Sequence, residues 1–222
     1  MMQSKNLRKN KIIILDNGHG KETAGKRSPD GLFREYRWCR DFVKILKKEL
    51  TDFGYTAIEL VPEENDISLD ERINRTNDIC KMYDVKNCIL VSIHNNAAKS
   101  DGEWHSATGW EAYTTRDNTD SDKLADLLYK EIELQNIHTR KDYSDGDSDK
   151  EANFKILLVN CAAVLTENMF MDNKNDIEFL NSDEGISKLI AAHKNAIKKY
   201  FGDIIENAYN ATKTTINKQN LK

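Results

Sequence analysis

The chain has 222 residues, of which 39% are hydrophobic and 32% are charged, and its formal net charge is −4 at pH 7. This length suffices for one domain with a substantial core, and the composition is typical of a globular protein with a well-solvated surface. The negative net charge argues against a nucleic-acid binder, which normally presents a basic face. No apolar stretch approaches the roughly 20 residues of a transmembrane helix, so we expect no membrane-spanning segment.

The N-terminus and the cysteines indicate the cellular setting. Residues 1–10 are polar and basic and contain no apolar core ahead of the fold, so no secretory signal peptide is visible. The sequence has four cysteines without a C-x-x-C pair: Cys39, Cys80, Cys88 and Cys161. We therefore expect buried, reduced thiols and no zinc ribbon.

The first half of the sequence alternates strand and helix patterns. The predicted elements are a strand at 11–16, a helix at 35–52, a strand at 55–61 and a helix at about 69–83. A glycine-rich loop follows the first strand. Apolar residues at helical spacing predict the first helix, which ends before Gly54. The second helix opens on a capping-box pattern that begins at Ser68.

The second half repeats this alternation. Its predicted elements are strands at 88–94 and 110–114, a helix at 121–135, two short apolar runs at 154–159 and 162–165, and a helix at about 182–201. The pattern predicts one α/β domain over 11–201, with a mostly parallel twisted sheet and helices on both faces. We expect segments 1–10 and 202–222 to be polar termini.

Two of the predicted strands end in a histidine. His19 follows the strand at 11–16, and His94 closes the strand at 88–94. In an open α/β sheet, ligands bind in the crevice outside the carboxyl ends of the strands. Two imidazoles at one such edge could hold a metal ion, and a catalytic zinc site uses three protein ligands with an open fourth position.

A third ligand and a base are also available near this edge. Glu35 begins the helix that follows the first loop, while Glu22 and Asp30 are alternative carboxylates within that loop. Glu167 follows the apolar run at 162–165, where it could act as a general base. Taken alone, Glu167 fits a helix cap or a surface carboxylate equally well.

Taken in order, these motifs resemble the zinc-dependent N-acetylmuramoyl-L-alanine amidases of the amidase-3 type, found in bacterial wall-remodelling enzymes and phage endolysins. The resemblance covers about 11–201 and rests on four sites: DNGHG at 16–20, Glu35, SIHNN at 92–96 and ENMFMDN at 167–173. It implies that His19, Glu35 and His94 bind Zn²⁺ and that Glu167 is the catalytic glutamate. The implied reaction is hydrolysis of the peptidoglycan amide between N-acetylmuramic acid and the L-alanine of the stem peptide.

The sequence departs from the family pattern at three positions near these motifs. Asn17 and Ala162 stand where members of the family usually have proline, and Met169 stands where glycine usually follows the glutamate. None of the four chemical positions is lost, so we expect an active enzyme. The loop 99–108 is longer than the minimal pattern; it either shapes the substrate groove or is an insertion without function.

The remaining histidines and the acidic loop have simpler interpretations. His105, His138 and His193 lack partners at ligand spacing, so we expect surface or structural roles for all three. The acidic loop 140–151 lacks the glutamate that closes an EF-hand, and we expect no calcium site there.

Two other functions fit the same residues. One is a zinc peptidase that cuts within the stem peptide, and the other is a catalytically silent wall-binding module. The expected location combines synthesis in the cytoplasm with action on the cell wall, in the periplasm, after release, as for a phage or prophage endolysin. The sequence does not determine the oligomeric state, and we expect a monomer.

Overall fold

The computed structural model describes residues 8–116, 119–144 and 146–203; the rest of the expected polar termini, 1–7 and 204–222, lies outside the described residues. The strands are β1 (Ile12–Asn17), β2 (Thr56–Glu59), β3 (Cys88–Asn96), β4 (Glu111–Thr114), β5 (Lys150–Glu151) and β6 (Ala162–Phe170). The α-helices are α2 (Glu35–Phe53), α3 (Leu69–Tyr83), α4 (Asp120–Leu134), α5 (Lys174–Asn181) and α6 (Asp183–Tyr200).

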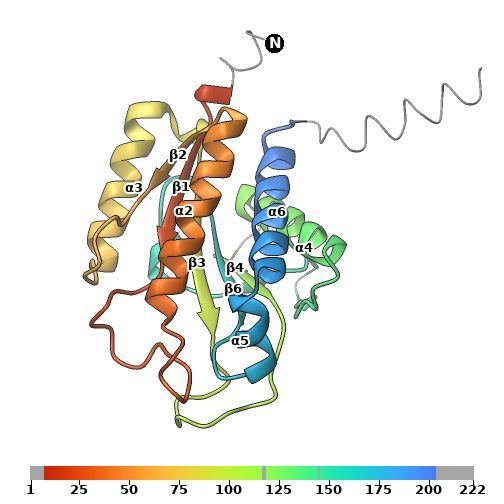
Figure 1. Cartoon of the computed structure of the whole chain (residues 1–222). Helices are drawn as coiled ribbons and strands as arrows, with labels where there is room; N and C mark the ends of the chain where they lie inside the picture. Colours follow the sequence, from red (N-terminus) through yellow and green to blue (C-terminus); the bar gives the residue numbers. More distant parts are fainter. Residues whose placement is uncertain (1–7, 117–118, 145, 204–222) are drawn as a thin grey trace, which may run out of the picture.

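The six strands form one sheet in the order β2-β1-β3-β6-β4-β5. The first four run parallel, β4 is antiparallel to β6, and β5 is parallel to β4. The predicted α/β fold with a mostly parallel sheet is therefore confirmed (Figure 1).

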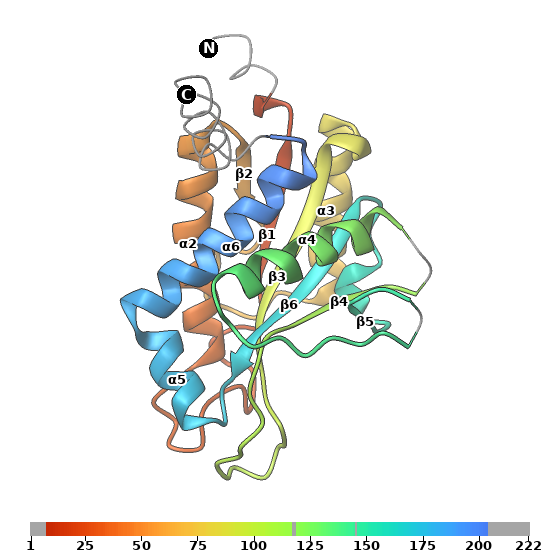
Figure 2. The ribbon, with the colours of Figure 1, turned by 90° about the vertical axis from the view of Figure 1, so that its right-hand side faces the viewer.

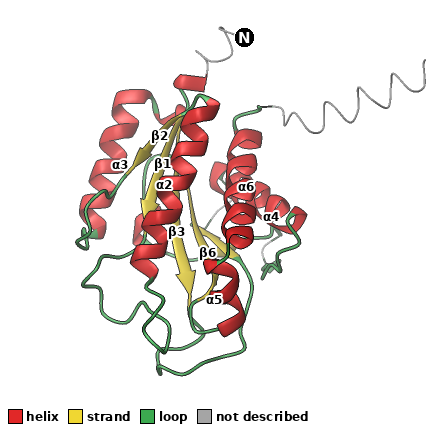
Figure 3. Ribbon diagram, in the orientation of Figure 1, coloured by secondary structure: helices red, strands yellow, loops and turns green. Residues whose placement is uncertain are grey.

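Helices cover both faces of the sheet, as predicted. Alternate residues of β1 divide between two cores: Ile13 and Leu15 pack toward α2, α4 and α6, while Ile12 and Ile14 pack toward α3. Figures 2 and 3 show the two helical layers with the sheet between them. Because both faces of β1 and β3 are covered, these strands consist of nearly continuous apolar runs.

The last part of the chain holds one element that the sequence did not predict. The apolar run at 154–159 forms a short 3₁₀ turn at Lys155–Leu157. The predicted helix at 182–201 is confirmed as α6, but the unpredicted helix α5 precedes it, and Ser182 ends α5 and caps α6 by accepting the Gly185 N–H at 2.9 Å. A Cβ at Gly185 would collide with the Phe179 carbonyl, so this tight junction depends on glycine.

The four cysteines are buried and free, as expected. In the part of the chain that the structure describes, no helix is long and apolar enough to cross a membrane. The carboxyl ends of β1, β3 and β6 meet at one edge of the sheet, where long loops gather at the lower end of Figure 1. This edge holds the candidate site.

Candidate metal centre

His19 lies just beyond β1 in an uncommon backbone conformation. Its φ of 61° falls in the left-handed region, which few residues other than glycine adopt. Gly18 precedes it, and a Cβ at Gly18 would fall on the imidazole ring of His94. The missing Cβ therefore lets the two histidines approach, and their rings meet edge to face with centroids 4.9 Å apart.

The carboxylate of Glu35 lies between the two imidazoles. Its Oε1 is 3.1 Å from Nδ1 of His94 and 3.4 Å from Nε2 of His19. The same oxygen accepts the backbone N–H of Asn95 at 3.0 Å. Glu35 begins α2 and is fully buried, so helix α2 and strand β3 together fix its position.

The ionisation of these groups reflects their mutual contact. Burial alone would raise the pKa of Glu35, but the close contacts of its carboxylate with the imidazoles of His19 and His94 hold that pKa well below its usual range. Burial lowers the pKa of His19. His94 is buried too, but its contact with Glu35 raises its pKa overall. Glu35 is therefore an ionised ligand candidate in a site with little access to water.

The donor set fits a divalent metal ion such as zinc. One ligand atom from each of His19, Glu35 and His94 lies within 4.8 Å of the others. Nε2 of His19 and Oε2 of Glu35 are buried and have no hydrogen-bond partner. Unsatisfied buried polar atoms are costly, and a shared cation would satisfy both. Two imidazoles and one carboxylate form a known donor set for catalytic zinc.

Glu167 lies beside this group, on β6. It pairs in register with His94 of β3, and its Oε2 is buried without a hydrogen-bond partner. Burial, followed by the negative charge of Glu35, raises the pKa of Glu167 to about 8, against the opposing effect of His94. A carboxyl group with such a pKa is often found at catalytic sites.

The departure at Met169 has a structural consequence. Met169 adopts a φ of 65°, in the region where glycine is favoured. The turn after Glu167 therefore tolerates a side chain, as the sequence requires. The neighbouring Asn168 donates to the carbonyl of His94 at 3.1 Å, which joins β6 to β3 beside the site.

The alternative carboxylates have other partners. Oε1 of Glu22 accepts the N–H of Asp66 at 3.1 Å, and Asp30 accepts the hydroxyl of Ser28 at 2.5 Å. Neither belongs to the group around His19 and Glu35. The structure thus brings together the four residues that the resemblance implied and leaves both competitors outside.

The other histidines are not close to the centre. His105 pairs with Asp101 at 2.9 Å, and His138 is exposed. His193 is fully buried, and its Nδ1 contacts the carbonyl of Leu189 at 2.8 Å. We expected a surface or a structural role for each of these histidines, and His193 has a structural role.

Sequence reasoning missed several charged residues around the site. Arg40 and Arg72 both donate to the carbonyl of His19, at 3.0 and 3.4 Å. Glu111 is buried on β4, opposite Glu167 in the register, and forms an ion pair with Lys150 at 3.0 Å. Single arginines and glutamates within helix and strand patterns carry no sequence signal of burial.

The acidic loop 140–151 forms a group with Asp122 of α4, whose part in it sequence reasoning did not predict. Ligand atoms of Asp122, Asp147 and Asp149 lie within 4.8 Å of one another. Burial, together with the neighbouring carboxylates, raises the pKa of Asp149 to about 7. The expectation that the loop 140–151 holds no calcium stays a prediction.

The loops of this chain form two cavities, and one of them reaches the candidate metal centre. One, of about 420 Å³, is lined by His19 and His94 together with Asp16, Arg72 and the segment 66–69. The other, of about 430 Å³, lies between the loop 24–29 and the loop 97–103. The long loop 99–108 therefore contributes a wall to a cavity.

Comparisons with known proteins show the family to which the chain belongs. A family model described as N-acetylmuramoyl-L-alanine amidase, of the amidase-3 type, matches residues 13–199. The chain is 29% identical over 192 residues to N-acetylmuramoyl-L-alanine amidase CwlM of Bacillus licheniformis, covering 85% of this chain and 68% of that protein. It is 28% identical over 195 residues to an endolysin of Bacillus phage SPP1, covering 84% of this chain and 65% of that protein. The chain thus spans about two thirds of the length of these relatives.

Solved structures share the fold. The N-acetylmuramoyl-L-alanine amidase from Clostridium difficile 630 matches with a TM-score of 0.73 at 24% identity, covering 86% of this chain and 96% of that one. The catalytic domain of the CD27L endolysin targeting Clostridia difficile matches with a TM-score of 0.59 at 19% identity, covering 88% and 99%. Because the family model covers most of the sequence, including all four motifs of the site, the chain belongs to the N-acetylmuramoyl-L-alanine amidase family.

Proposed function

We propose that the protein is a zinc-dependent N-acetylmuramoyl-L-alanine amidase that hydrolyses peptidoglycan. The bond cleaved is the amide between the lactyl group of N-acetylmuramic acid and the L-alanine of the stem peptide. The observation that carries this proposal is the contact of buried Glu35 with both His19 and His94, with Glu167 in register beside His94. Family membership supplies the substrate class.

In this proposal His19, Glu35 and His94 would hold the zinc ion. A zinc ion held there acidifies water toward a pKa of about 7 and polarises a carbonyl group. The backbone N–H of Asn95 orients Glu35, and Gly18 leaves room for the ring of His94. The cavity lined by His19 and His94 provides space for the substrate beside the centre.

Glu167 has the role of general base and then general acid. Its carboxylate accepts a proton from the water that attacks the lactyl carbonyl carbon. The carbon–nitrogen bond breaks, and Glu167 returns the proton to the departing nitrogen of L-alanine. The products are a lactyl carboxylate and a stem peptide with a free amino terminus. The raised pKa of Glu167, about 8, suits a group that holds and releases a proton near neutral pH.

The segment 11–201 is proposed as the catalytic domain, and the cell wall as its place of action. One relative is a bacterial amidase and another is a phage endolysin. Release of the protein as an endolysin is therefore part of the proposal, with a bacterial wall-remodelling amidase as the alternative origin.

The test combines metal content with product analysis. Purified protein is expected to hold about one zinc per chain, and His94→Ala should lose it while His105→Ala, which alters a histidine away from the centre, should retain it. Digested peptidoglycan should release stem peptides that begin with L-alanine. Cleavage within the stem peptide would favour the peptidase. Wall binding without hydrolysis by the zinc-loaded protein would favour the silent module.

A further inference from the structure

We propose that Arg72, assisted by Arg40, is a positioning residue that fixes the backbone of His19 and so presents its imidazole to the metal. This inference rests on the proposed function, because it takes His19 as a metal ligand. Neither arginine belongs to the ligand group itself. Both act on the carbonyl of His19, from helices that cover opposite faces of the sheet (Figure 2).

His19 needs such support because of its backbone conformation. A residue with a Cβ remains in the left-handed region only when its surroundings hold it there. The next residue, Gly20, lies so close to the segment after β2 that a Cβ on it would collide with the backbone of Asp66. The turn is fastened to that segment by Thr23, which donates to Asp66 at 2.5 Å and accepts the N–H of Gly20 at 2.9 Å.

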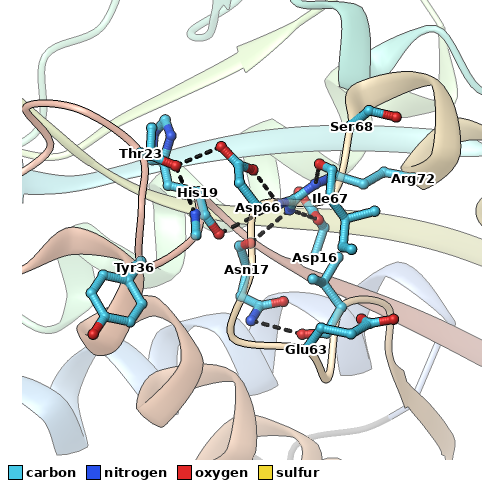
Figure 4. Close-up of polar contacts among 12 residues, drawn as sticks. Asp16, Asn17, His19, Thr23, Tyr36, Glu63, Asp66, Ile67, Ser68 and Arg72 are labelled. Carbon is cyan, nitrogen blue, oxygen red and sulfur yellow. Dashed lines mark hydrogen bonds and ion pairs between the residues drawn. The ribbon is translucent and has the colours of Figure 1, made fainter.

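Arg72 reaches this turn from α3 with two of its side-chain nitrogens, while the third binds the segment before the helix (Figure 4). Nη1 donates to the carbonyl of Asn17 at 2.7 Å, Nη2 lies 3.4 Å from the carbonyl of His19, and Nε donates to the carbonyl of Ile67 at 2.8 Å. The planar guanidinium presents its donors in a fixed fork. A lysine at this position could keep the charge but could not contact these carbonyls together.

The ion pair of Arg72 links β1 and β3, the two strands that lead to His19 and His94. The side chain is 2% exposed and pairs with Asp16 of β1 through Nη1, at 2.6 Å. The other oxygen of Asp16 accepts the hydroxyl of Ser92 at 2.5 Å. Ser92 lies on β3, two residues before His94. One buried network therefore joins helix α3 to the ends of both strands that deliver histidines.

Arg40 reaches the same carbonyl from α2, the helix that begins with Glu35. Its Nη1 donates to His19 at 3.0 Å and to the carbonyl of Tyr36 at 3.1 Å. Its Nε and Nη2 donate to the carbonyl of Glu63 at 3.1 and 2.7 Å. All of these acceptors are backbone oxygens, so replacing Arg40 removes the support for His19 without breaking a carboxylate hydrogen bond.

Three variants test the proposal. Arg72→Lys keeps the charge opposite Asp16, and Arg40→Gln removes only donors to backbone. Arg75→Gln is the matched control, since Arg75 lies one turn along α3 from Arg72 and binds Glu63, Glu71 and the Leu60 carbonyl instead of the His19 turn. Circular dichroism and urea unfolding establish that each variant is folded before metal is measured.

The first readout needs no metal. Hydrogen exchange of the backbone amides at 18–23 in the zinc-free protein should accelerate by about tenfold or more in Arg72→Lys and Arg40→Gln, and stay within twofold in Arg75→Gln. The second readout is the zinc dissociation constant from chelator competition. It should rise by about 10- to 100-fold, as is typical when a group supporting a metal ligand is lost. The visible spectrum of the cobalt-substituted protein should change in the same two variants.

Unchanged exchange at 18–23 in both variants would overturn the proposal, even if they lose activity. Parent-like zinc affinity and cobalt spectra in both folded variants would also overturn it, and would leave the proposed function intact. Absence of zinc binding by the parent would instead refute the proposed function, while the exchange experiment would still decide whether the arginines hold the His19 turn.

Discussion

At the residue scale, the proposed chemistry depends on one buried carboxyl group, that of Glu167, beside the cluster of candidate metal ligands. Glu167 pairs in register with His94, and burial raises its pKa to about 8. It is also influenced by Glu35, whose negative charge opposes ionisation of a second carboxyl nearby. Two carboxyl groups in one site with pKa values shifted in opposite directions indicate two different roles.

Replacing Glu167 with glutamine separates catalysis from binding. Glu167→Gln keeps the size of the side chain but removes the base, so hydrolysis of peptidoglycan should fall by about 10²- to 10⁴-fold. Zinc content and the midpoint of thermal unfolding should match those of the parent. Digestion by zinc-loaded Glu167→Gln at a rate within threefold of the parent would show that this carboxyl group is not the base.

A second prediction at the residue scale concerns the zinc affinity of a variant at Gly18. In Gly18→Ala the new methyl group falls on the ring of His94, so the imidazole has to turn away from Glu35. We expect the zinc dissociation constant to rise at least about tenfold, in line with the loss of ligand orientation. Ala24→Ser, at an exposed position of the same loop, is the control. Equal zinc affinity for Gly18→Ala and the parent would contradict the steric argument.

Much of the site can be predicted from the sequence because its residues mark the ends of elements. His19 and His94 follow apolar strands, and Glu35 begins a helix, so their common edge follows from the fold class. Arg40 and Arg72 could not be found in this way. An arginine in a helix pattern is normally solvent-exposed, and these two are buried with partners that include backbone carbonyls far away in the sequence.

At the element scale, α3 shows how a local signal supports a distant site. Ser68 caps the helix by accepting the N–H of Glu71 at 3.2 Å, as the capping pattern predicted. The helix then places Arg72 in its first turn, against the end of β1. Residues 66–69, which lead into α3, also line the cavity beside His19 and His94.

Removing this helix cap should lower the free energy of unfolding of the protein by a modest amount. Ser68→Ala leaves an N–H of the first turn without its acceptor, which costs about 1 kcal/mol of the free energy of unfolding. Urea denaturation measures the change. Ser68→Thr keeps the oxygen and should lose much less. Equal stability of the alanine variant and the parent would show that water replaces the cap without cost.

The elements that sequence reasoning did not predict share a physical cause. Periodicity predicted the last helix, α6, but not the short helix α5, which ends where Gly185 meets the Phe179 carbonyl. The apolar run at 154–159 forms a turn that packs Ile156 and Leu157 against the α3 side of the sheet. In each case tertiary packing decides between local conformations that the sequence allows equally well.

At the scale of the whole molecule, stability depends on a sheet buried between two helical layers. His193 of α6 lies in the larger core, where it contacts Phe42 of α2 and Trp110 with ring centroids 5.2 and 6.2 Å apart. Burial lowers the pKa of His193 to about 4. The folded protein therefore resists protonation of a group that the unfolded chain protonates near pH 6.5.

This difference gives a pH dependence with a definite sign. Between pH 6.5 and pH 4 the unfolded state binds the proton more readily, so the stability contributed by neutral His193 is present above pH 6.5 and is lost as the pH falls toward 4. The shift corresponds to about 3 kcal/mol. Urea denaturation at pH 7.5 and pH 4 measures the free energies of unfolding of the parent and of His193→Gln. Between these two pH values the parent should lose about 3 kcal/mol more than the variant. Parallel pH profiles for the two proteins would contradict the assignment.

The position of the cleaved bond is the most direct test of the proposed amidase. Peptidoglycan is digested in water enriched in ¹⁸O, and the products are separated and analysed by mass. We predict one ¹⁸O atom in the lactyl carboxylate of N-acetylmuramic acid, together with unlabelled stem peptides that begin with L-alanine. An ¹⁸O atom in a carboxylate of the stem peptide, with the lactyl amide intact, would contradict the proposed function.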